Sequence, residues 1–331
     1  MNHFWQQLKK PFFVLAPMAD VTDIVFRNFV LRYSRPDVLY TEFVACKMLL
    51  APKNRKLLMR YLQYSPSERP IVAQLFGSEP DDFFACARLL REWGFDGMDI
   101  NMGCPNRRVE RRGAGAHLMR DPQRAQAIIQ AAKEGLGDLP LAVKTRLGYH
   151  VIETESWIGA VLAAKPDVLV VHGRTRQEMS EVPAHWDEIA VAATMAHDVG
   201  VLCVGNGDVD SREQGEEYAQ RFGVDGIMIG RGVFGNPWVF ATQAERSESE
   251  KLLALARFIT QFTGFWQTAK REGLLKKHFN AYIEDSPGSK TLRMELMTTA
   301  SAAAALETLA RYFHQHGWIF PEIFYERIMS A

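Results

Sequence analysis

The sequence predicts an α/β fold, namely a (β/α)8 TIM barrel followed by a C-terminal all-helical domain. Eight short apolar runs rich in β-branched residues recur between residues 12 and 232. Continuous runs of this kind are typical of strands buried on both faces of a parallel sheet. A helical stretch separates most of the runs, and this alternation is typical of a closed barrel. A doubly wound open sheet is the structural alternative, but eight strands in about 230 residues favour closure.

Each predicted strand ends in a polar or glycine-rich tail. The eight runs occupy residues 12–19, 38–43, 71–77, 97–105, 141–148, 168–175, 201–208 and 226–232. In barrels of this kind the active site lies at the C-terminal ends of the strands. The polar tails therefore hold the candidate functional residues.

Local signals predict where several helices begin. Ser78 followed by Asp81 resembles a capping box, and the helix that it opens runs to about Gly94. Asp121 and Pro122 read as an N-cap followed by a first-turn proline, opening a helix that ends near residue 135. Ser211 begins another helix, which runs to about residue 222.

The character of the sequence changes after about residue 241, where helical periodicity continues without another strand. We therefore expect two domains, a barrel over residues 1–243 and a helical domain over residues 244–331. The helical part carries a basic stretch at 270–278, and Lys290 and Arg293 follow it. With the aromatic residues Trp266, Phe279 and Tyr282 as stacking groups, these cations predict a groove that tracks an RNA backbone.

Composition limits the classes of protein that the chain can represent. Its 331 residues carry 39 basic and 39 acidic side chains, 47% are hydrophobic and 24% are charged, as in a soluble globular protein. The four cysteines show no metal-ligand spacing, so we expect neither a disulfide scaffold nor a metal site. No signal peptide and no run of about 18 apolar residues is present, so we expect a cytoplasmic protein that does not span a membrane. We also expect a monomer.

The polar tails are rich in hydrogen-bond donors and cations, which suits an anionic, planar, acceptor-rich ligand better than a metal. The sequences GNGD and GRG follow the last two strands, where barrels commonly bind phosphate through backbone N–H groups. Lys144 could hold negative charge on a reduced flavin, and His172 lies at the mouth of the barrel. Cys104 follows the fourth strand, where it could act as a nucleophile or as a general acid.

At these residues the sequence resembles the tRNA-dihydrouridine synthases, and among them the bacterial members of the DusB kind. The resemblance covers almost the whole chain, and the pairing of DINMGCP with GAGAHLM is highly specific. The matching blocks are APMADVTD (16–23), TEFV (41–44), AQLFGS (73–78), DINMGCPNRRV (99–109), GAGAHLM (113–119), VKTRLG (143–148), VHGRT (171–175), GNGD (205–208), GIMIGRG (226–232) and KKHF with PGSKTLRMEL (276–296).

The resemblance implies FMN as cofactor, NADPH or NADH as reductant, and the 5,6 double bond of uridines in the D-loop region of tRNA as substrate. It implies hydride transfer to C6 and Cys104 as the proton donor to C5. A thiol with a pKa of about 8.5 is largely protonated at neutral pH, so it can donate.

The resemblance also assigns roles to the strand-end residues. Pro17, Met18 and Ala19 would line the flavin ring, Gln74 and Lys144 would bond its polar edge, and His172 would contact it. The phosphate end would be held by Asn206, Gly207, Asp208, Gly230 and Arg231. The uracil would be held by Asn101 and Arg146, and RNA or phosphate would be contacted by Arg174 and Arg176.

Several alternatives stay open at this stage. An FMN barrel that acts on a small molecule of the dihydroorotate or enone type would share the phosphate loops and Lys144, but it would not need the basic helical domain. The same reaction on ribosomal RNA is a second alternative. An RNA-binding protein without catalysis and a flavin-free barrel that binds phosphate sugars are two others. The intact Cys104, Lys144 and Asn101 argue against the first of these.

Overall fold

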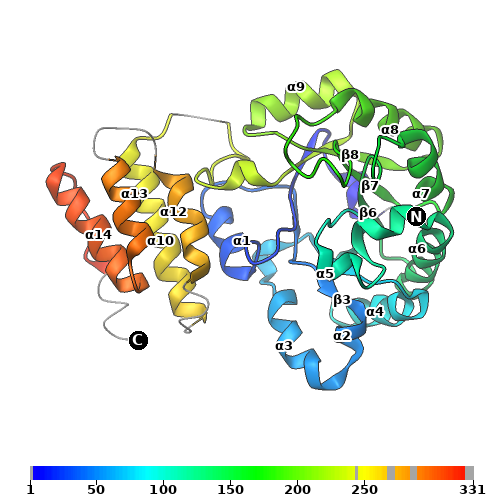
Figure 1. The fold of residues 1–331 in the computed structure, drawn as a ribbon, viewed down its shortest axis with the longest axis horizontal. Coiled ribbons are helices and arrows are strands. Elements are labelled where there is room, and N and C mark those ends of the chain that lie inside the picture. Colours follow the sequence, from blue (N-terminus) through cyan, green and yellow to red (C-terminus); the bar gives the residue numbers. More distant parts are fainter. Residues whose placement is uncertain (1–2, 243–244, 267–272, 284–288, 325–331) are drawn as a thin grey trace. The chain divides into compact units, whose positions relative to one another are not determined.

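The computed structural model describes the chain except residues 1–2, 243–244, 267–272, 284–288 and 325–331 (Figure 1). The chain forms two compact units. Unit 1 comprises Met1–Arg27 and Arg35–Gly230, and unit 2 comprises Asn28–Ser34 and Arg231–Ala331. The sequence analysis expected a boundary between residues 243 and 244, but it referred to domains that fold independently. The two compact units do not test that boundary, so it stays a prediction.

Unit 1 contains the predicted barrel. Its parallel strands pair in the order β2-β1-β9-β8-β7-β6-β5-β4-β3, and an additional pairing of β2 with β4 closes the sheet. β3 is a two-residue strand that pairs only with the end of β4, so eight strands form the barrel itself. The strands are β1 (Phe12–Leu15), β2 (Val38–Tyr40), β3 (Val44–Ala45), β4 (Ile71–Phe76), β5 (Gly97–Asn101), β6 (Leu141–Arg146), β7 (Val168–His172), β8 (Leu202–Asn206) and β9 (Gly226–Ile229).

Helices surround the sheet, and Figure 1 shows α4, α6, α7, α8 and α9 around its outside. α6 approaches α4 closely at Gly135, where a Cβ would lie 2.4 Å from the Phe84 carbonyl oxygen. The helices of this part of the chain are α1 (Ile24–Leu31), α2 (Cys46–Leu50), α3 (Pro52–Leu62), α4 (Pro80–Glu92), α5 (Arg107–Glu110), α6 (Pro122–Leu136), α7 (Gly159–Ala163), α8 (Trp186–Asp198) and α9 (Arg212–Phe222), with shorter turns η1 (Phe4–Gln7), η2 (Pro66–Glu68), η3 (Gly115–Arg120) and η4 (Thr154–Ile158).

Two of the three predicted helix starts are confirmed. The Asp121 side chain accepts the Arg124 N–H as the N-cap of α6, and the Ser211 hydroxyl accepts the Gln214 N–H as the N-cap of α9. The capping box at Ser78 was wrong. The N-cap of α4 is Glu79, and Pro80 is the first helical residue. Proline suits this position because it has no N–H group that would require a hydrogen-bond acceptor.

The barrel interior is filled by alternate residues of the strands. Because successive side chains of a strand point to opposite faces, one parity of each strand faces the interior. The N-terminal turn η1 adds Trp5, which is 1% exposed and packs on Phe12 at a ring-centroid distance of 5.5 Å. Since Phe12 is the first residue of β1, Trp5 fills the N-terminal end of the barrel. The interior cluster is Trp5, Phe12, Val14, Ala16, Val38, Tyr40, Val72, Ala142, Val168, Val170, Val204 and Met228.

Four aspartates repeat one contact at the N-terminal edge of the barrel. Each directly precedes a strand, and each carboxylate accepts the N–H of a residue on the neighbouring strand at 2.7–2.8 Å. The backbone N–H of the same aspartate donates to the carbonyl of that same residue, so the contact is reciprocal. The pairs are Asp37 with Phe13, Asp96 with Ile71, Asp167 with Leu141, and Asp225 with Cys203. This reciprocal contact between an aspartate and the neighbouring strand therefore occurs once in every two strands of the barrel. The sequence analysis did not detect it.

Unit 2 is helical, as predicted. Trp266, Phe279 and Tyr282 are at most 6% exposed, so they form its core and offer no exposed surface for stacking bases. That part of the predicted RNA groove was wrong, because the aromatic side chains pack inward among the helices. Residues 270–272 of the basic stretch lie outside the described residues. No helix in the described ranges is long and apolar enough to cross a membrane. The helices are η5 (Arg231–Val233), α10 (Glu248–Trp266), η6 (Gly273–Leu275), α12 (Lys276–Tyr282), α13 (Ser289–Thr298) and α14 (Ala302–Gln315).

We predict that Asp225→Ala lowers the free energy of unfolding by about 1–3 kcal/mol, because the buried Cys203 N–H loses its acceptor. The same change also removes the partner of Lys10 and His197. Urea denaturation measures the difference. The control is Asp138→Ala, at an exposed position outside the repeat, and equal losses in the two variants would contradict the structural role of the repeat.

Candidate functional site

A cavity of about 310 Å³ opens where the barrel strands end. It brings together nine of the residues that the sequence analysis selected, although they come from five different strands and the loops that follow them. Phe43, Gly103 and Pro105 complete the lining and were not selected. The selected residues in the lining are Pro17, Met18, Ala19, Gln74, Asn101, Cys104, Lys144, Arg146 and His172.

A chain of hydrogen bonds crosses the base of this cavity. The Asn101 Oδ1 atom accepts the N–H groups of Gly103 and Cys104 at 3.1 and 2.9 Å. Its Nδ2 group donates to Gln74 Oε1 at 2.9 Å, and Gln74 Nε2 donates to Asp99 Oδ2 at 2.7 Å. The amide groups of Gln74 and Asn101 are therefore held in one orientation.

Asp99 is a residue of this site that the sequence analysis missed. It is fully buried in β5, and burial raises its pKa to about 7, although the Gln74 hydrogen bond and Lys144 lower it. A signal was present in the sequence, because Asp99 lies two residues before Asn101 in a strand and so faces the same side. The register aligns Asp99 with Gln74 on β4.

Lys144 is the cation at the centre of the site. Its ammonium group donates to Asn206 Oδ1 at 2.9 Å, and Asn206 in turn donates to the Met228 carbonyl at 2.8 Å. Burial, followed by the charge of Arg146, lowers the pKa of Lys144 to about 8, while Asp99 and Cys104 raise it. Lys144 is therefore mostly charged at neutral pH but close to losing its proton.

Cys104 differs from the other cysteines of the chain. Its side chain lines the cavity, whereas Cys46, Cys86 and Cys203 are buried. Burial raises the pKa of the Cys104 thiol, while the Asn106 N–H and the Arg146 charge lower it. The net shift is upward, so this group is a protonated thiol at neutral pH.

Two predicted ligand-binding arginines hold the loops of the site. Arg146 donates from Nε to the Gly103 carbonyl at 2.9 Å and from Nη1 to the Thr175 and Met179 carbonyls. Arg174 donates to Asp208 Oδ2 at 2.5 Å and to the Val182 carbonyl, and it lies 3.1 Å from His172 Nε2. Both guanidinium groups therefore donate hydrogen bonds to backbone carbonyls beside the cavity.

Arg176 forms a two-point ion pair with Glu110 on α5, through Nε at 2.8 Å and Nη2 at 2.5 Å. The ring of Tyr149 lies beneath two cations, with Arg176 at 5.4 Å and Arg120 at 5.5 Å from its centroid. This cluster ties the segment after Cys104 to the loop after β7. The sequence analysis did not pair Glu110 with Arg176, which is 66 residues away.

The residues predicted for the phosphate end lie outside the described lining of the cavity. Asn206 reaches the cavity only through Lys144, and Gly207 has a φ of +137°, which favours glycine. Gly230 is the last residue of unit 1, whereas Arg231 begins the second segment of unit 2. Lys290 and Arg293 lie on α13 in unit 2, where Arg293 donates to the Ile283 carbonyl at 2.9 Å.

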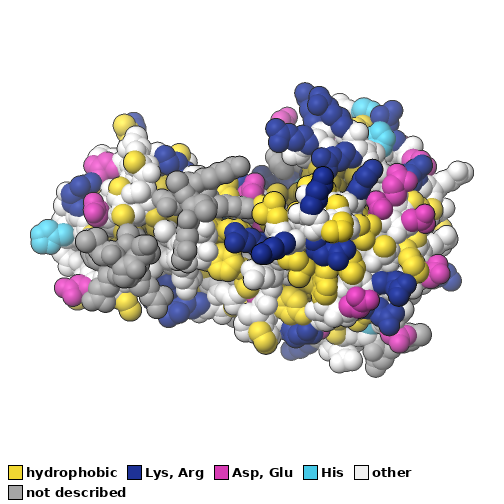
Figure 2. Space-filling model, turned by 90° about the horizontal axis from the view of Figure 1, so that it is seen from below, with side chains coloured by type: hydrophobic (Ala, Val, Ile, Leu, Met, Phe, Trp, Pro, Cys, Tyr) yellow, Lys and Arg dark blue, Asp and Glu magenta, His cyan; other side chains and the backbone are white. Residues whose placement is uncertain are grey.

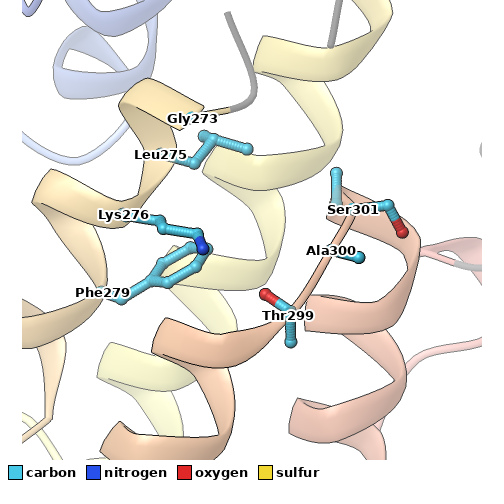
Figure 3. A pocket seen from close by; sticks show the side chains of 8 residues that line it. Gly273, Leu275, Lys276, Phe279, Thr299, Ala300 and Ser301 are labelled. Atoms are coloured by element: carbon cyan, nitrogen blue, oxygen red, sulfur yellow. The ribbon is translucent and has the colours of Figure 1, made fainter. Parts of the chain in front are cut away.

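Unit 2 contains a cavity of its own, of about 210 Å³ (Figure 3). Lys276 and Phe279 of α12 lie across it from the turn formed by residues 299–301. Lys276 is the one ionisable side chain in its described lining, and its ammonium group donates to the Met297 carbonyl at 2.9 Å. This cavity therefore offers little chemistry, in contrast to the cavity in unit 1.

Basic side chains are numerous on one face of the molecule. Figure 2 shows Lys and Arg side chains gathered on the face seen from below, with hydrophobic side chains between them. The segment that follows the Cys104 loop adds four exposed arginines, at positions 107, 108, 111 and 112. The net charge of zero therefore conceals local positive charge.

The fold and the cavity together define an enzyme of the α/β-barrel class, with a site that combines an apolar strip, oriented amides, a buried lysine and a protonated thiol. Among the described residues, no group of three or more His, Cys, Asp or Glu side chains could hold a metal ion.

Comparison with known proteins identifies the family. A family model described as dihydrouridine synthase (Dus) matches residues 14–316. A Staphylococcus epidermidis protein named "Probable tRNA-dihydrouridine synthase" is 41% identical over 313 residues, which cover 93% of this chain and 95% of that protein. A Bacillus subtilis protein named "Probable tRNA-dihydrouridine synthase 2" is 40% identical over 305 residues, covering 91% and 93%. The chain belongs to the dihydrouridine synthase family, which confirms the resemblance seen in its motifs.

A solved structure supports the fold alone. Histamine dehydrogenase from Rhizobium sp. 4-9 aligns with a TM-score of 0.51 and 13% sequence identity. The alignment covers 75% of this chain and 48% of that protein, so the chain spans about half the length of the dehydrogenase.

We predict that Asp99→Asn gains stability relative to the unchanged protein as the pH rises from 5 to 7.5. The pKa of Asp99 is higher in the folded protein, at about 7, than in the unfolded chain. Such a carboxyl contributes its full stabilisation at pH values below the unfolded pKa, and this contribution is lost as the pH rises through the folded pKa. Asparagine has no such loss. Urea denaturation at both pH values should show a relative gain of at least about 1 kcal/mol, whereas the exposed Asp138→Asn should show none. A difference that does not change with pH would contradict the assignment.

Proposed function

We propose that this protein reduces the 5,6 double bond of uridines in the D-loop region of tRNA to 5,6-dihydrouridine, with FMN as cofactor and NADPH or NADH as reductant. The observation that carries the proposal is the single cavity in which the Cys104 thiol, the Lys144 ammonium group and the oriented amides of Gln74 and Asn101 meet. The family of its relatives supports the choice of substrate.

The residues of the cavity fit a flavin. Pro17, Met18 and Ala19 provide an apolar strip for a flat ring, and Gln74 provides an amide for its polar edge. Lys144 would place a positive charge beside the reduced ring, which carries negative charge. His172 completes this wall of the cavity, and Asn206, Gly207, Asp208, Gly230 and Arg231 would hold the phosphate end.

When bound at these residues, reduced FMN would supply the chemistry of hydride transfer to C6 of the uracil. The protein must then supply a proton at C5. Cys104 is suited to this task because its raised pKa keeps the thiol protonated at neutral pH. Asn101 and Arg146 line the same cavity and would hold the uracil by its carbonyl and N–H groups. Positioning of the base beside the thiol is the second contribution of these residues.

The target base must leave its stack to enter the cavity, which costs a few kcal/mol. Contacts with the RNA backbone would offset this cost. The exposed arginines at 107–112 would bind phosphates near the mouth of the cavity, and Lys290 and Arg293 would do so in the helical unit. In this proposal Arg174 and Arg176 act mainly by holding loops, because their guanidinium groups already bind Asp208 and Glu110.

The proposal is tested by the absorbance spectrum of the purified protein, followed by NADPH oxidation with and without a tRNA transcript. Flavin bands that NADPH bleaches and that tRNA restores are the expected result, and mapping of dihydrouridine in the product gives the position. Ribosomal RNA, orotate and a small enone serve as competing substrates. Restoration of the bands by one of these and not by tRNA would overturn the choice of substrate.

We predict that Cys104→Ala still binds FMN but forms dihydrouridine about 10²–10⁴ times more slowly, because a general acid typically contributes that much. Product formation from tRNA at saturating NADPH measures the loss. Cys86→Ala is the control, since Cys86 is buried in α4 away from the cavity. Normal turnover in Cys104→Ala would rule out its role as the acid.

We predict that Lys144→Met lowers the affinity for FMN by about 10–100-fold, which corresponds to the loss of one hydrogen bond to a charged group. In the unchanged protein the affinity should also weaken above about pH 8, where Lys144 loses its proton, and the variant should lack this dependence. Titration of FMN fluorescence measures both effects. Lys53→Met, at an exposed position on α3, is the matched control. An unchanged affinity in Lys144→Met would count against the placement of the flavin.

A further inference from the structure

Asp99 is a buried ionisable group of unit 1 that the proposed reaction does not use. Its side chain is fully buried within β5, two residues before Asn101, which lines the cavity. Oδ2 accepts from Gln74, while Oδ1 has no hydrogen-bond partner among the described residues. A buried carboxylate with only one partner is costly, so its presence calls for a physical account.

The donors and acceptors of the chain from Asp99 to Cys104 permit only one arrangement. The N–H groups of Gly103 and Cys104 can only donate, so the oxygen of Asn101 must face them. The NH2 group of Asn101 then faces Gln74 and requires its oxygen. The NH2 group of Gln74 must therefore face Asp99, which has to accept. A carboxyl group satisfies this need whether or not it is protonated, because Oδ2 stays an acceptor.

Without an acceptor at position 99, the hydrogen-bond chain loses the group that fixes the orientation of the Gln74 amide. The NH2 group of Gln74 would be buried without a partner, which costs about 1–3 kcal/mol. Rotation of the Gln74 amide by half a turn would relieve that cost by turning its NH2 group away from position 99 and toward the cavity. Its NH2 group would then face the NH2 group of Asn101, which would have to rotate as well. The N–H groups of Gly103 and Cys104 would lose their acceptor.

We propose that Asp99 is a positioning residue that, through Gln74 and Asn101, fixes the amides of the cavity and holds the loop that carries Cys104. The role of that loop as the source of the proton rests on the function proposed above, but the orientation of the amides does not. Asp99 touches none of the reacting atoms, because Gln74 and Asn101 lie between it and the loop.

Other contacts hold the remainder of the loop, so the effect of Asp99 is local. The Gly103 carbonyl accepts from Arg146 at 2.9 Å, and the Met102 N–H donates to the Lys144 carbonyl at 2.8 Å. A Cβ on Gly103 would lie 3.3 Å from the Thr145 carbonyl carbon, so the loop packs directly on β6. Loss of the acceptor at position 99 should therefore release two N–H groups and leave the barrel folded.

The test is hydrogen exchange of the Gly103 and Cys104 amides in the full chain, with and without FMN, at one pH. Asp99→Leu removes the acceptor while keeping a side chain branched at Cγ, and it should speed the exchange of both amides by about tenfold. Asp99→Asn keeps an acceptor oxygen and should stay within about twofold of the unchanged protein. Asn101→Ala removes the acceptor of the two amides directly and sets the upper limit.

The Cys203 amide is the internal reference, because it is bound by Asp225 at the opposite end of the barrel and reports loss of the whole fold. If Asp99→Leu does not fold, Gln74→Ala breaks the same chain one step later and should release the same two amides. Full protection of these amides in the folded Asp99→Leu or in Gln74→Ala overturns the proposal, and so does equal release in Asp99→Asn and Asp99→Leu. Failure of the unchanged protein to form dihydrouridine would sink the proposed function and leave these exchange rates intact.

Discussion

The site depends on the closure of the parallel sheet by the pairing of β2 with β4. In a closed sheet one parity of every strand faces the interior, and water is excluded from it. Below the cavity this interior is filled by apolar side chains such as Val72, Ala142 and Val204. Near the strand ends the same parity carries Gln74, Asp99, Asn101 and Lys144. Polar residues at these positions are therefore packed into the top of an apolar core, where they must satisfy one another.

The low dielectric at this place explains the electrostatics of the site. Burial raises the pKa of Asp99 and of Cys104 and lowers that of Lys144, so all three shifts favour the neutral forms. The shift keeps the Cys104 thiol protonated at neutral pH. Lys144 and Asp99 oppose each other's shifts, because each charge stabilises the other. One environment thus holds a protonated thiol and a cation in the lining of the same cavity.

The two ends of the barrel serve different purposes. At the N-terminal end, Trp5 fills the interior and four aspartates bind backbone N–H groups across neighbouring strands, which fixes register. At the C-terminal end the side chains bind one another and the loops, as in the pairs of Arg174 with Asp208 and of Arg176 with Glu110. The N-terminal end of the barrel therefore serves the packing and register of the strands, whereas the C-terminal end carries the polar groups of the cavity.

The sequence by itself determined the eight strands, two of the helix caps and nine of the residues that line the cavity. Strand runs and the caps at Asp121 and Ser211 depend on neighbouring residues, and the residues of the cavity follow from the rule that strand ends meet at one edge. Tertiary structure alone decided the contacts that join distant segments. Glu110 meets Arg176 across 66 residues, Trp266 packs inward, and Asp99 meets Gln74, because these contacts depend on strand register and packing, which no local pattern encodes.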